Sequence, residues 1–296
     1  MHANSHCMAC IRRKQKQAAT RCRNEQEQAA YLAEVERILE QYGKTESSPW
    51  LAEKIDAMQK RFWDDTQTYA KIKHQYNELL LSQEDVLMAQ IAEAPDPVRA
   101  CIQYVCAANY IDFAAVDSVT EHTLSQIMGK AQAEQVPQAE YDLFCRDLER
   151  AKTLVYLTDN CGEIVLDKLF IGVLRQTYPH LQITAMVRGQ AVINDATMED
   201  AEEVGLTKLV PCMGSGCACP GTVLSRLSDQ ARQTLLEADV VVSKGQGNFE
   251  ALYGEGVNPY YLFLCKCDLF VRRFGLTQFS SVFQKEERLE LKEEVE

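Results

Sequence analysis

Positive charge is scarce in this 296-residue sequence, and long apolar runs are missing. Lysine and arginine number 31 against 43 aspartates and glutamates, which gives a formal net charge of −12 at pH 7. Such an acidic balance argues against general binding to nucleic acid or to an anionic membrane surface. No apolar run approaches the length of a membrane span, and the first residues, MHANSH, contain no apolar signal core. We therefore expect a cytoplasmic protein without nucleic-acid or membrane partners.

Glycine-rich nucleotide loops are missing as well. The chain has no Walker P-loop spacing and no spaced Gly-x-Gly-x-x-Gly of a dinucleotide fold. The composition is otherwise that of an ordinary soluble globular protein, with 46% hydrophobic and 25% charged residues. At this length the chain can form one large domain or two modest ones.

Strand patterns are absent before residue 150, where apolar residues recur at helical spacing. The expected helices there are 24–43, 50–63, 69–81, 83–92, 98–108, 120–130 and 139–150. Beyond residue 150, buried strands alternate with helices, which is typical of an α/β fold. The expected strands are 154–157, 182–187, 207–210, 240–242 and 260–264, with helices at 164–176 and 224–237 and a charged, solvated tail from 284. We predict a three-layer α/β/α domain with a mostly parallel sheet over residues 131–296, preceded by an all-helical bundle or cap over 1–130.

Two of these strands end in a pair of polar residues. Asp159-Asn160 follows strand 154–157, and Asn194-Asp195 follows the unit that begins with strand 182–187. Ligands of open α/β sheets bind at the carboxyl ends of the strands. Two carboxylates and an amide oxygen suit Mg²⁺, Mn²⁺ or a similar hard cation. Either pair could instead simply cap a helix.

A third strand, 240–242, leads into the loop Lys244-Gly245-Gln246-Gly247-Asn248. The two glycines would let backbone amides approach a ligand closely, and Lys244 would add a mobile positive charge suited to phosphate. By itself, a Lys-Gly-x-Gly loop is weak evidence for a phosphate site.

Together these segments resemble the domain-of-unknown-function 89 family, the ARMT-like damage-control phosphatases. The matching blocks are DNCGEIVLD at 159–167, NDATMEDA at 194–201 and KGQGNFE at 244–250. Further matches are CMAC at 7–10, NYIDF at 109–113 and Lys266-Cys267, so the resemblance covers nearly the whole chain. The Cys-x-x-Cys and Lys-Cys motifs are similar to those of the prokaryotic-type branch of the family.

The resemblance implies a metal-dependent phosphatase. It implies that Asp159, Asn160 and Asp195 bind Mn²⁺, Co²⁺, Ni²⁺ or Mg²⁺ and act in catalysis together with Lys244. It also implies a group of substrate-binding residues: Glu163, Asn109, Asp112, Asn194, Gly245, Gln246, Gly247, Asn248 and Lys266. The expected substrates are small phosphomonoesters, either sugar phosphates or damaged phospho-metabolites, attacked by water or by Asp159 itself. The identity of the substrate and the oligomeric state stay open.

The sequence also departs from the family pattern. The Arg-Thr-x-Lys motif of eukaryotic-type branches is absent, which leaves Lys266 as the nearest candidate for that phosphate contact. Cys217 and Cys219 are departures from the sequence usual in their loop. Cys7 and Cys10 are taken as a marker of the branch, and we expect them to pack near Cys267.

Two alternatives from other functional classes remain. One is a protein carboxyl methyltransferase, although the first strand is not followed by a Gly-x-Gly-x-Gly loop for the cofactor. The other is a non-catalytic metal or redox module built on some of the twelve cysteines.

Overall fold

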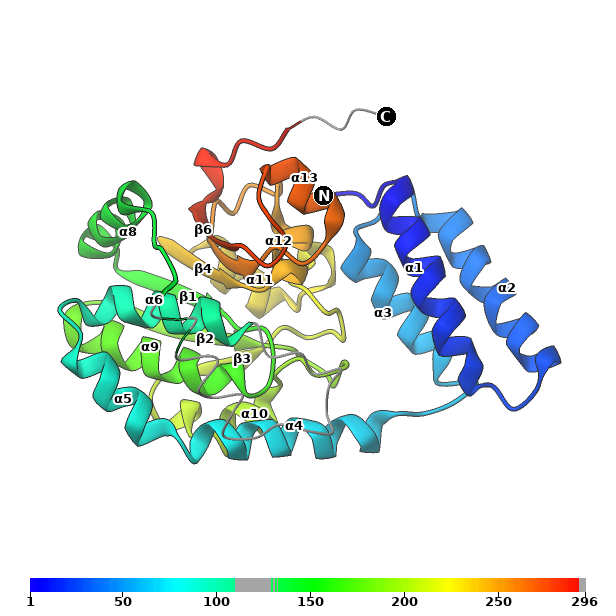
Figure 1. Ribbon diagram of the computed structural model, residues 1–296, viewed down its shortest axis with the longest axis horizontal. Coiled ribbons are helices and arrows are strands. Elements are labelled where there is room, and N and C mark those ends of the chain that lie inside the picture. Colours follow the sequence, from blue (N-terminus) through cyan, green and yellow to red (C-terminus); the bar gives the residue numbers. More distant parts are fainter. Residues whose placement is uncertain (110–128, 130, 132, 293–296) are drawn as a thin grey trace.

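A six-stranded sheet with the strand order β3-β2-β1-β4-β5-β6 forms the centre of the molecule in the computed structural model (Figure 1). The structure describes residues 1–109, 129, 131 and 133–292. The strands are β1 Thr153–Leu157, β2 Gln182–Val187, β3 Cys212–Gly214, β4 Val240–Lys244, β5 Tyr260–Leu264 and β6 Ser281–Lys285. Neighbouring strands are parallel except for β6, which pairs antiparallel with β5. The predicted mostly parallel sheet is therefore confirmed.

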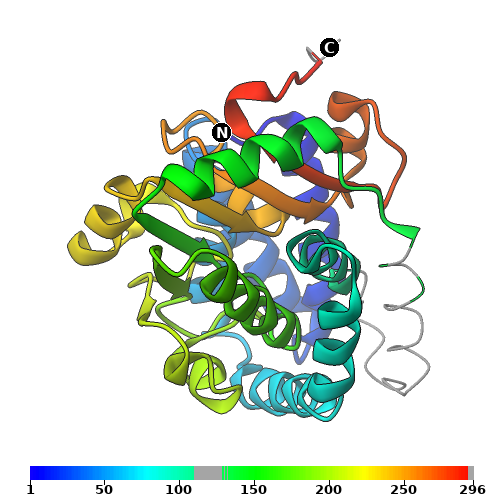
Figure 2. The same cartoon turned by 90° about the vertical axis from the view of Figure 1, so that its left-hand side faces the viewer.

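Helices cover both faces of this sheet, as the alternation of side chains along β1 shows. Leu154 and Tyr156 pack into a core shared with α6 (Pro97–Ala108) and α9 (Glu163–Thr177), which Figure 2 shows side by side. Val155 and Leu157 point the other way, as expected for successive strand residues. They pack toward α11 (Asp229–Leu236), α12 (Gln246–Leu252) and α13 (Asp268–Phe274). The predicted three-layer α/β/α architecture is thus confirmed.

The first three helices form a unit with its own hydrophobic core. They are α1 Ser5–Ala18, α2 Glu25–Tyr42 and α3 Ser48–Gln59. Their core includes Tyr31 and Leu51, together with Cys217, Cys219 and Val223 from the loop after β3. Helix α3 also packs against α12, so this unit joins the α/β part beside the strand–helix connection after β4 (Figure 1).

The remaining amino-terminal helices belong to the core of the sheet. These are α4 Thr66–Leu81, α5 Glu84–Glu93 and α6, and α4 packs on α9 and on α10 (Met198–Glu203). Helix α8 (Gln138–Arg150) then leads directly into β1 and packs against β6. The predicted helical first half is present, although only α1–α3 are separate from the sheet's core. The predicted helix 120–130 lies largely outside the described residues.

Local signals in the sequence explain where several helices begin. The side chains of Asn24, Asp96 and Ser228 accept hydrogen bonds from the backbone N–H three residues later, each satisfying one of the free donors of a first helical turn. Pro49 lies in the first turn of α3, where its missing N–H removes no helical hydrogen bond. In the described part of the chain, no helix is both long and apolar enough to cross a bilayer.

Three predictions of elements were wrong. Residues predicted as the strand 207–210 contain instead a 3₁₀ turn, Leu206–Lys208, and the short edge strand β3 follows at Cys212–Gly214. The predicted helix 224–237 is interrupted because Ser228 starts a new helix, α11. The strand 260–264 is not the last one, since β6 lies in the segment preceding and entering the predicted tail, with Val282 and Phe283 buried on opposite faces of the sheet.

Candidate active site

The strand order reverses between β1 and β4, and the predicted polar loops follow these two strands. Asp159 and Asn160 follow the end of β1 after a single residue, Thr158, and Lys244 is the last residue of β4. β2 and β3 lie on one side of β1, while β4 and β5 lie on the other. Ligands of open α/β sheets bind in the crevice that such a switch point leaves at the carboxyl edge.

The Asn194-Asp195 segment folds back onto the loop after β1. The N–H of Cys161 donates to the carbonyl of Asn194 (2.9 Å), and the N–H of Ala196 donates to the carbonyl of Asp159 (2.8 Å). Asn160 and Asp195 form an isolated antiparallel bridge between the two segments. The structure therefore brings the three predicted metal ligands, Asp159, Asn160 and Asp195, into one place.

Arg188, which directly follows β2, links Asp159 and Asp195 and was not among the predicted site residues. Its Nε donates to Asp195 Oδ2 (2.6 Å), and its Nη1 donates to Asn248 Oδ1 (2.8 Å). Its Nη2 lies 3.6 Å from Asp159 Oδ1 and has no hydrogen-bond partner among the described residues. The Arg188 side chain is 3% exposed, so this donor is buried beside Asp159. Its position just beyond the end of a buried strand, like that of Asp159, was the signal available in the sequence.

Lys244 is held in place, contrary to the expectation of a mobile charge. Its Nζ lies 2.9 Å from Asp167 Oδ1 and 3.3 Å from Glu163 Oε2, and its side chain is almost fully buried. Asp167 also accepts a hydrogen bond from the Tyr156 hydroxyl (2.7 Å). A buried ammonium is stable only when paired, so the two carboxylates of α9 fix it beneath the loop.

Glu163 is buried among predicted site residues. Its Oε1 accepts hydrogen bonds from Asn109 Nδ2 and Asn160 Nδ2, both at 2.8 Å. Asn160 Nδ2 also donates to Asp159 Oδ2 (2.8 Å), and Asn194 Nδ2 donates to Asn160 Oδ1 (2.9 Å). Asn109 and Asn160 therefore orient the carboxylates of Glu163 and Asp159, and Asn194 orients the amide of Asn160.

The glycine loop after β4 touches Asp159 directly. Gly245 has φ +82°, and a Cβ on this residue would lie 2.1 Å from Asp159 Oδ2. Gly247 packs against the carbonyl of Pro220, where a Cβ would lie at 2.3 Å. Asn248 is buried, with its Nδ2 donating to the carbonyls of Thr158 (3.1 Å) and Lys244 (2.7 Å). Glycine is thus required at 245 by both conformation and close approach.

Gln246, the first residue of α12, contacts the loop after β5 that contains Lys266. Gln246 Oε1 accepts hydrogen bonds from the backbone N–H groups of Lys266 (3.2 Å) and Cys267 (3.3 Å), so its side chain joins α12 to that loop. The side chain of Lys266 is exposed. Asp112 lies outside the described residues. Burial raises the pKa of the Cys267 thiol.

Negative charge exceeds positive charge at the crevice. Four carboxylates, Asp159, Asp195, Glu163 and Asp167, face two cations, Arg188 and Lys244. Burial and the nearby carboxylates of Glu163 and Asp195 raise the pKa of Asp159 to about 7. Burial also raises the pKa of Asp195 and Asp167. A divalent cation would balance the excess, and two carboxylates with an amide oxygen are a donor set that fits Mg²⁺ or Mn²⁺.

Comparison with known proteins agrees with this geometry. Residues 3–282 match the family model described as the damage-control phosphatase ARMT1-like domain. The chain belongs to this family. Relatives include a "damage-control phosphatase" of Archaeoglobus fulgidus, 29% identical over 70% of this chain and 72% of its own length. An uncharacterized protein of Methanocaldococcus jannaschii is 24% identical over 94% of both chains. The crystal structure of a DUF89 family protein from Pyrococcus horikoshii shares the fold, with a TM-score of 0.84 and 20% identity over 97% of this chain and 99% of that one.

In this member of the damage-control phosphatase family, side chains of α4 contact the segments next to the predicted site residues. Asn77 Oδ1 accepts a hydrogen bond from the N–H of Gly162 (2.7 Å), and its Nδ2 donates to Asp200 Oδ1 (3.0 Å). Lys73 forms a buried ion pair with Asp200 at 2.5 Å. Both contacts join α4 to the loops that carry the predicted ligands. Sequence reasoning missed them because they connect residues more than 80 positions apart.

A cavity of about 450 Å³ lies beside the site of this family member. It is bounded by the end of α3, the first half of α4 and residues 191–193, which directly precede Asn194. Its walls carry six carboxylates against the two lysines Lys60 and Lys73. That lining suits the cationic or hydroxylated part of a ligand better than a phosphate.

Proposed function

We propose that this protein is a metal-dependent phosphatase that hydrolyses small phosphomonoesters. Membership of the damage-control phosphatase family supports the reaction class, and the arrangement of Asp159, Asn160 and Asp195 supports the metal. The observation that carries the proposal is the meeting of these three oxygen donors beside a free guanidinium donor on Arg188. The substrates would be sugar phosphates or damaged phospho-metabolites.

Asp159, Asn160 and Asp195 would hold a Mn²⁺, Co²⁺, Ni²⁺ or Mg²⁺ ion. When bound, the cation would supply Lewis-acid polarisation of a phosphoryl oxygen. The free Nη2 of Arg188 would donate to another phosphoryl oxygen and stabilise its developing charge. Lys244 would add positive potential from beneath the loop, where Glu163 and Asp167 hold it.

The residues around the loop would position the substrate rather than react with it. The backbone of Gly245 and Gly247 would approach the phosphate because neither residue has a side chain. Asn248 would keep the loop in place through its bonds to the carbonyls of Thr158 and Lys244. Asp159 would orient the attacking water or attack the phosphorus itself. Trapping a covalent phosphoryl-enzyme would distinguish these routes.

The test is phosphate release from a panel of phosphomonoesters. Protein freed of metal with a chelator would be resupplied with Mn²⁺, Co²⁺, Ni²⁺, Mg²⁺ or nothing. We expect release only with metal, and we expect Asp195→Asn to lower kcat by about 10² or more. The matched control is Asp229→Asn, which removes an exposed carboxylate on α11 and should leave release unchanged. Absence of release with every metal and ester would overturn the proposal.

A further inference from the structure

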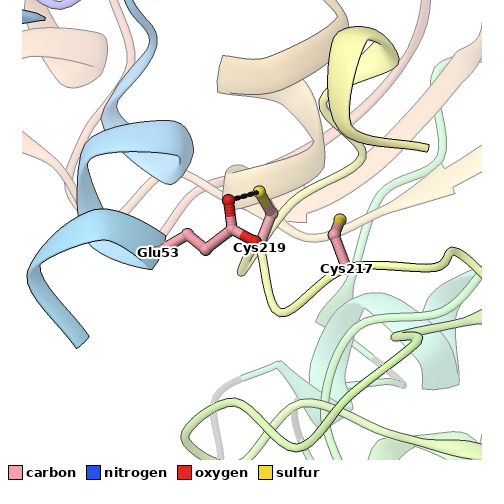
Figure 3. Close-up of side chains that lie close together, drawn as sticks. All are labelled: Glu53, Cys217 and Cys219. Atoms are coloured by element: carbon pink, nitrogen blue, oxygen red, sulfur yellow. Dashed lines mark hydrogen bonds between the residues drawn. The ribbon is translucent and has the colours of Figure 1, made fainter. Parts of the chain in front are cut away.

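A second group of ligand-bearing side chains lies apart from the predicted metal ligands. It consists of Glu53 on α3 and of Cys217 and Cys219 on the loop after β3 (Figure 3). One ligand atom from each residue lies within 4.8 Å of the other two, and all three residues are buried. Among the described residues this is the one group of three or more His, Cys, Asp or Glu side chains whose ligand atoms lie this close together.

The carboxylate of Glu53 is oriented by hydrogen bonds from neighbouring side chains. Arg226 Nε donates to Glu53 Oε2 (2.9 Å), and Arg226 Nη2 donates to Glu53 Oε1 (3.2 Å). The thiol of Cys219 donates to Glu53 Oε2 (3.2 Å). Metal ligands in proteins are commonly oriented by such second hydrogen bonds. The sulfur of Cys217 lies 3.9 Å from the hydroxyl oxygen of Ser215.

The donor chemistry selects a soft or borderline cation. Two thiolates and one carboxylate carry three negative charges, and Arg226 and a divalent cation carry three positive ones, so the buried group becomes neutral. Thiolates prefer Zn²⁺ and related ions, whereas the all-oxygen site at Asp159 and Asp195 prefers hard cations. Around a tetrahedral Zn²⁺, ligand atoms lie roughly 3.5–3.8 Å apart, so side chains within 4.8 Å of one another need to move only about 1 Å.

The cysteine loop also supports the predicted active site. Thr222 Oγ1 donates to Asn248 Oδ1 (2.8 Å), and Arg188 Nη1 lies 3.4 Å from the same hydroxyl. Gly221 packs on the carbonyl of Gly247, where a Cβ would lie at 2.5 Å. A cation held by this loop and by Glu53 would therefore tie the α1–α3 unit to the backbone that positions Asn248.

We propose that Glu53, Cys217 and Cys219 bind a thiolate-preferring divalent cation, Zn²⁺ in the first place, as a structural site separate from the phosphatase metal. Binding releases the thiol protons to solvent and forms two metal–sulfur bonds and one metal–oxygen bond. The site is structural because its ligands join two parts of the fold.

The test is a titration of the full-length, metal-free protein with Co²⁺ in the presence of a phosphine reductant. Thiolate ligation gives Co²⁺ a charge-transfer band in the near ultraviolet, which oxygen ligands do not give. We expect this band at one Co²⁺ per chain and its loss on addition of Zn²⁺. Cys217→Ser and Cys219→Ser should abolish the band, and Glu53→Gln should weaken Co²⁺ binding about tenfold or more.

Two controls separate this site from other thiols. Cys212→Ser alters a half-buried cysteine of β3 in the same segment, and Cys10→Ser alters the amino-terminal Cys-x-x-Cys pair; both should retain the band. A second measurement needs no variant: Zn²⁺ should protect Cys217 and Cys219 of the wild-type protein from alkylation, as read by mass spectrometry. A wild-type protein without the band, or a band that survives both Cys217→Ser and Cys219→Ser, would overturn the proposal.

Discussion

Arg188 is the cationic partner shared by Asp159 and Asp195, the two predicted acidic metal ligands. Its guanidinium pairs with Asp195 and faces Asp159, and it is buried. Replacing it with an apolar side chain of similar length would leave both carboxylates without that partner. Removing one member of a buried ion pair is costly because the other charge stays buried.

We predict that Arg188→Met lowers the free energy of unfolding by about 3–5 kcal/mol. Denaturant unfolding of the metal-free protein measures this change. Arg232→Met, on the exposed side of α11, is the control and should change stability by less than about 0.5 kcal/mol. Equal effects of the two substitutions would show that Arg188 is not the structural partner of Asp195.

Because of Asp159, the stability of the metal-free protein should decrease as the pH rises. Its pKa is raised to about 7 in the folded state, first by burial and then by Glu163 and Asp195. The folded chain therefore holds a proton that the unfolded chain releases near pH 4. The stability that this group contributes below about pH 4 is lost as the pH rises through about 7.

We predict that Asp159→Asn removes this loss and leaves the metal-free protein more stable than wild type at about pH 8, by on the order of 2–4 kcal/mol. At about pH 4 the two proteins should unfold at nearly the same denaturant concentration. Unfolding curves at both pH values, recorded in a chelator, measure the difference. A variant that is no more stable than wild type at the higher pH contradicts the electrostatic account.

At the scale of elements, the loop between β4 and α12 must approach Asp159 without a side chain. Gly245 and Gly254 both have φ +82°, but an added Cβ meets Asp159 Oδ2 at 2.1 Å only at Gly245 and meets nothing within 4 Å at Gly254. The two glycines therefore share the same φ and differ in their surroundings. Gly254 is therefore the control position for a substitution at Gly245.

We predict that Gly254→Ala costs about 1–2 kcal/mol of stability and retains phosphatase activity. Gly245→Ala should also carry backbone strain and in addition displace Asp159, so that metal-dependent phosphate release falls below one hundredth of wild type, as ~10²-fold losses follow misplacement of reacting groups. Steady-state kinetics and denaturant unfolding of both variants measure the two effects. Similar activities of the two variants would exclude the close approach as the reason for glycine at 245.

At the scale of the whole molecule, the hydrophobic residues form separate cores. Leu51 belongs to the α1–α3 core, whereas Leu154 belongs to the core beneath the sheet, and both are fully buried. The α1–α3 unit joins the rest through α12 and the loop after β3. Such units can open with less free energy than the whole fold.

We predict that Leu51→Ala speeds amide hydrogen exchange in α1–α3 while leaving β1 and β4 protected. Leu154→Ala should instead speed exchange throughout the sheet. Each substitution creates a cavity and costs about 2–5 kcal/mol, so the difference between them lies in where the cost appears. Exchange followed by mass spectrometry measures this. The same pattern in both variants would show that the chain unfolds as one cooperative unit.

The sequence by itself determined the fold class and brought the proposed site residues to one edge of the sheet. Apolar runs of strand length ending in Asp159-Asn160 and in Lys244-Gly245 are local patterns, and parallel strands place their carboxyl ends at one edge. It failed at the short edge strand β3 and at β6, whose pairing is supplied by neighbours rather than by a long apolar run.

Only the tertiary structure decided which side chains meet at the site. Lys244 was predicted to be a mobile phosphate ligand, but α9 places Glu163 and Asp167 beside it and burial requires that the ammonium be paired. Arg188 acquired its role because Asp159 and Asp195 converge on it from two loops. Glu53 and Cys219 meet across 166 positions of the chain. Local periodicity contains no information on such contacts, because they are fixed by the packing of whole elements against one another.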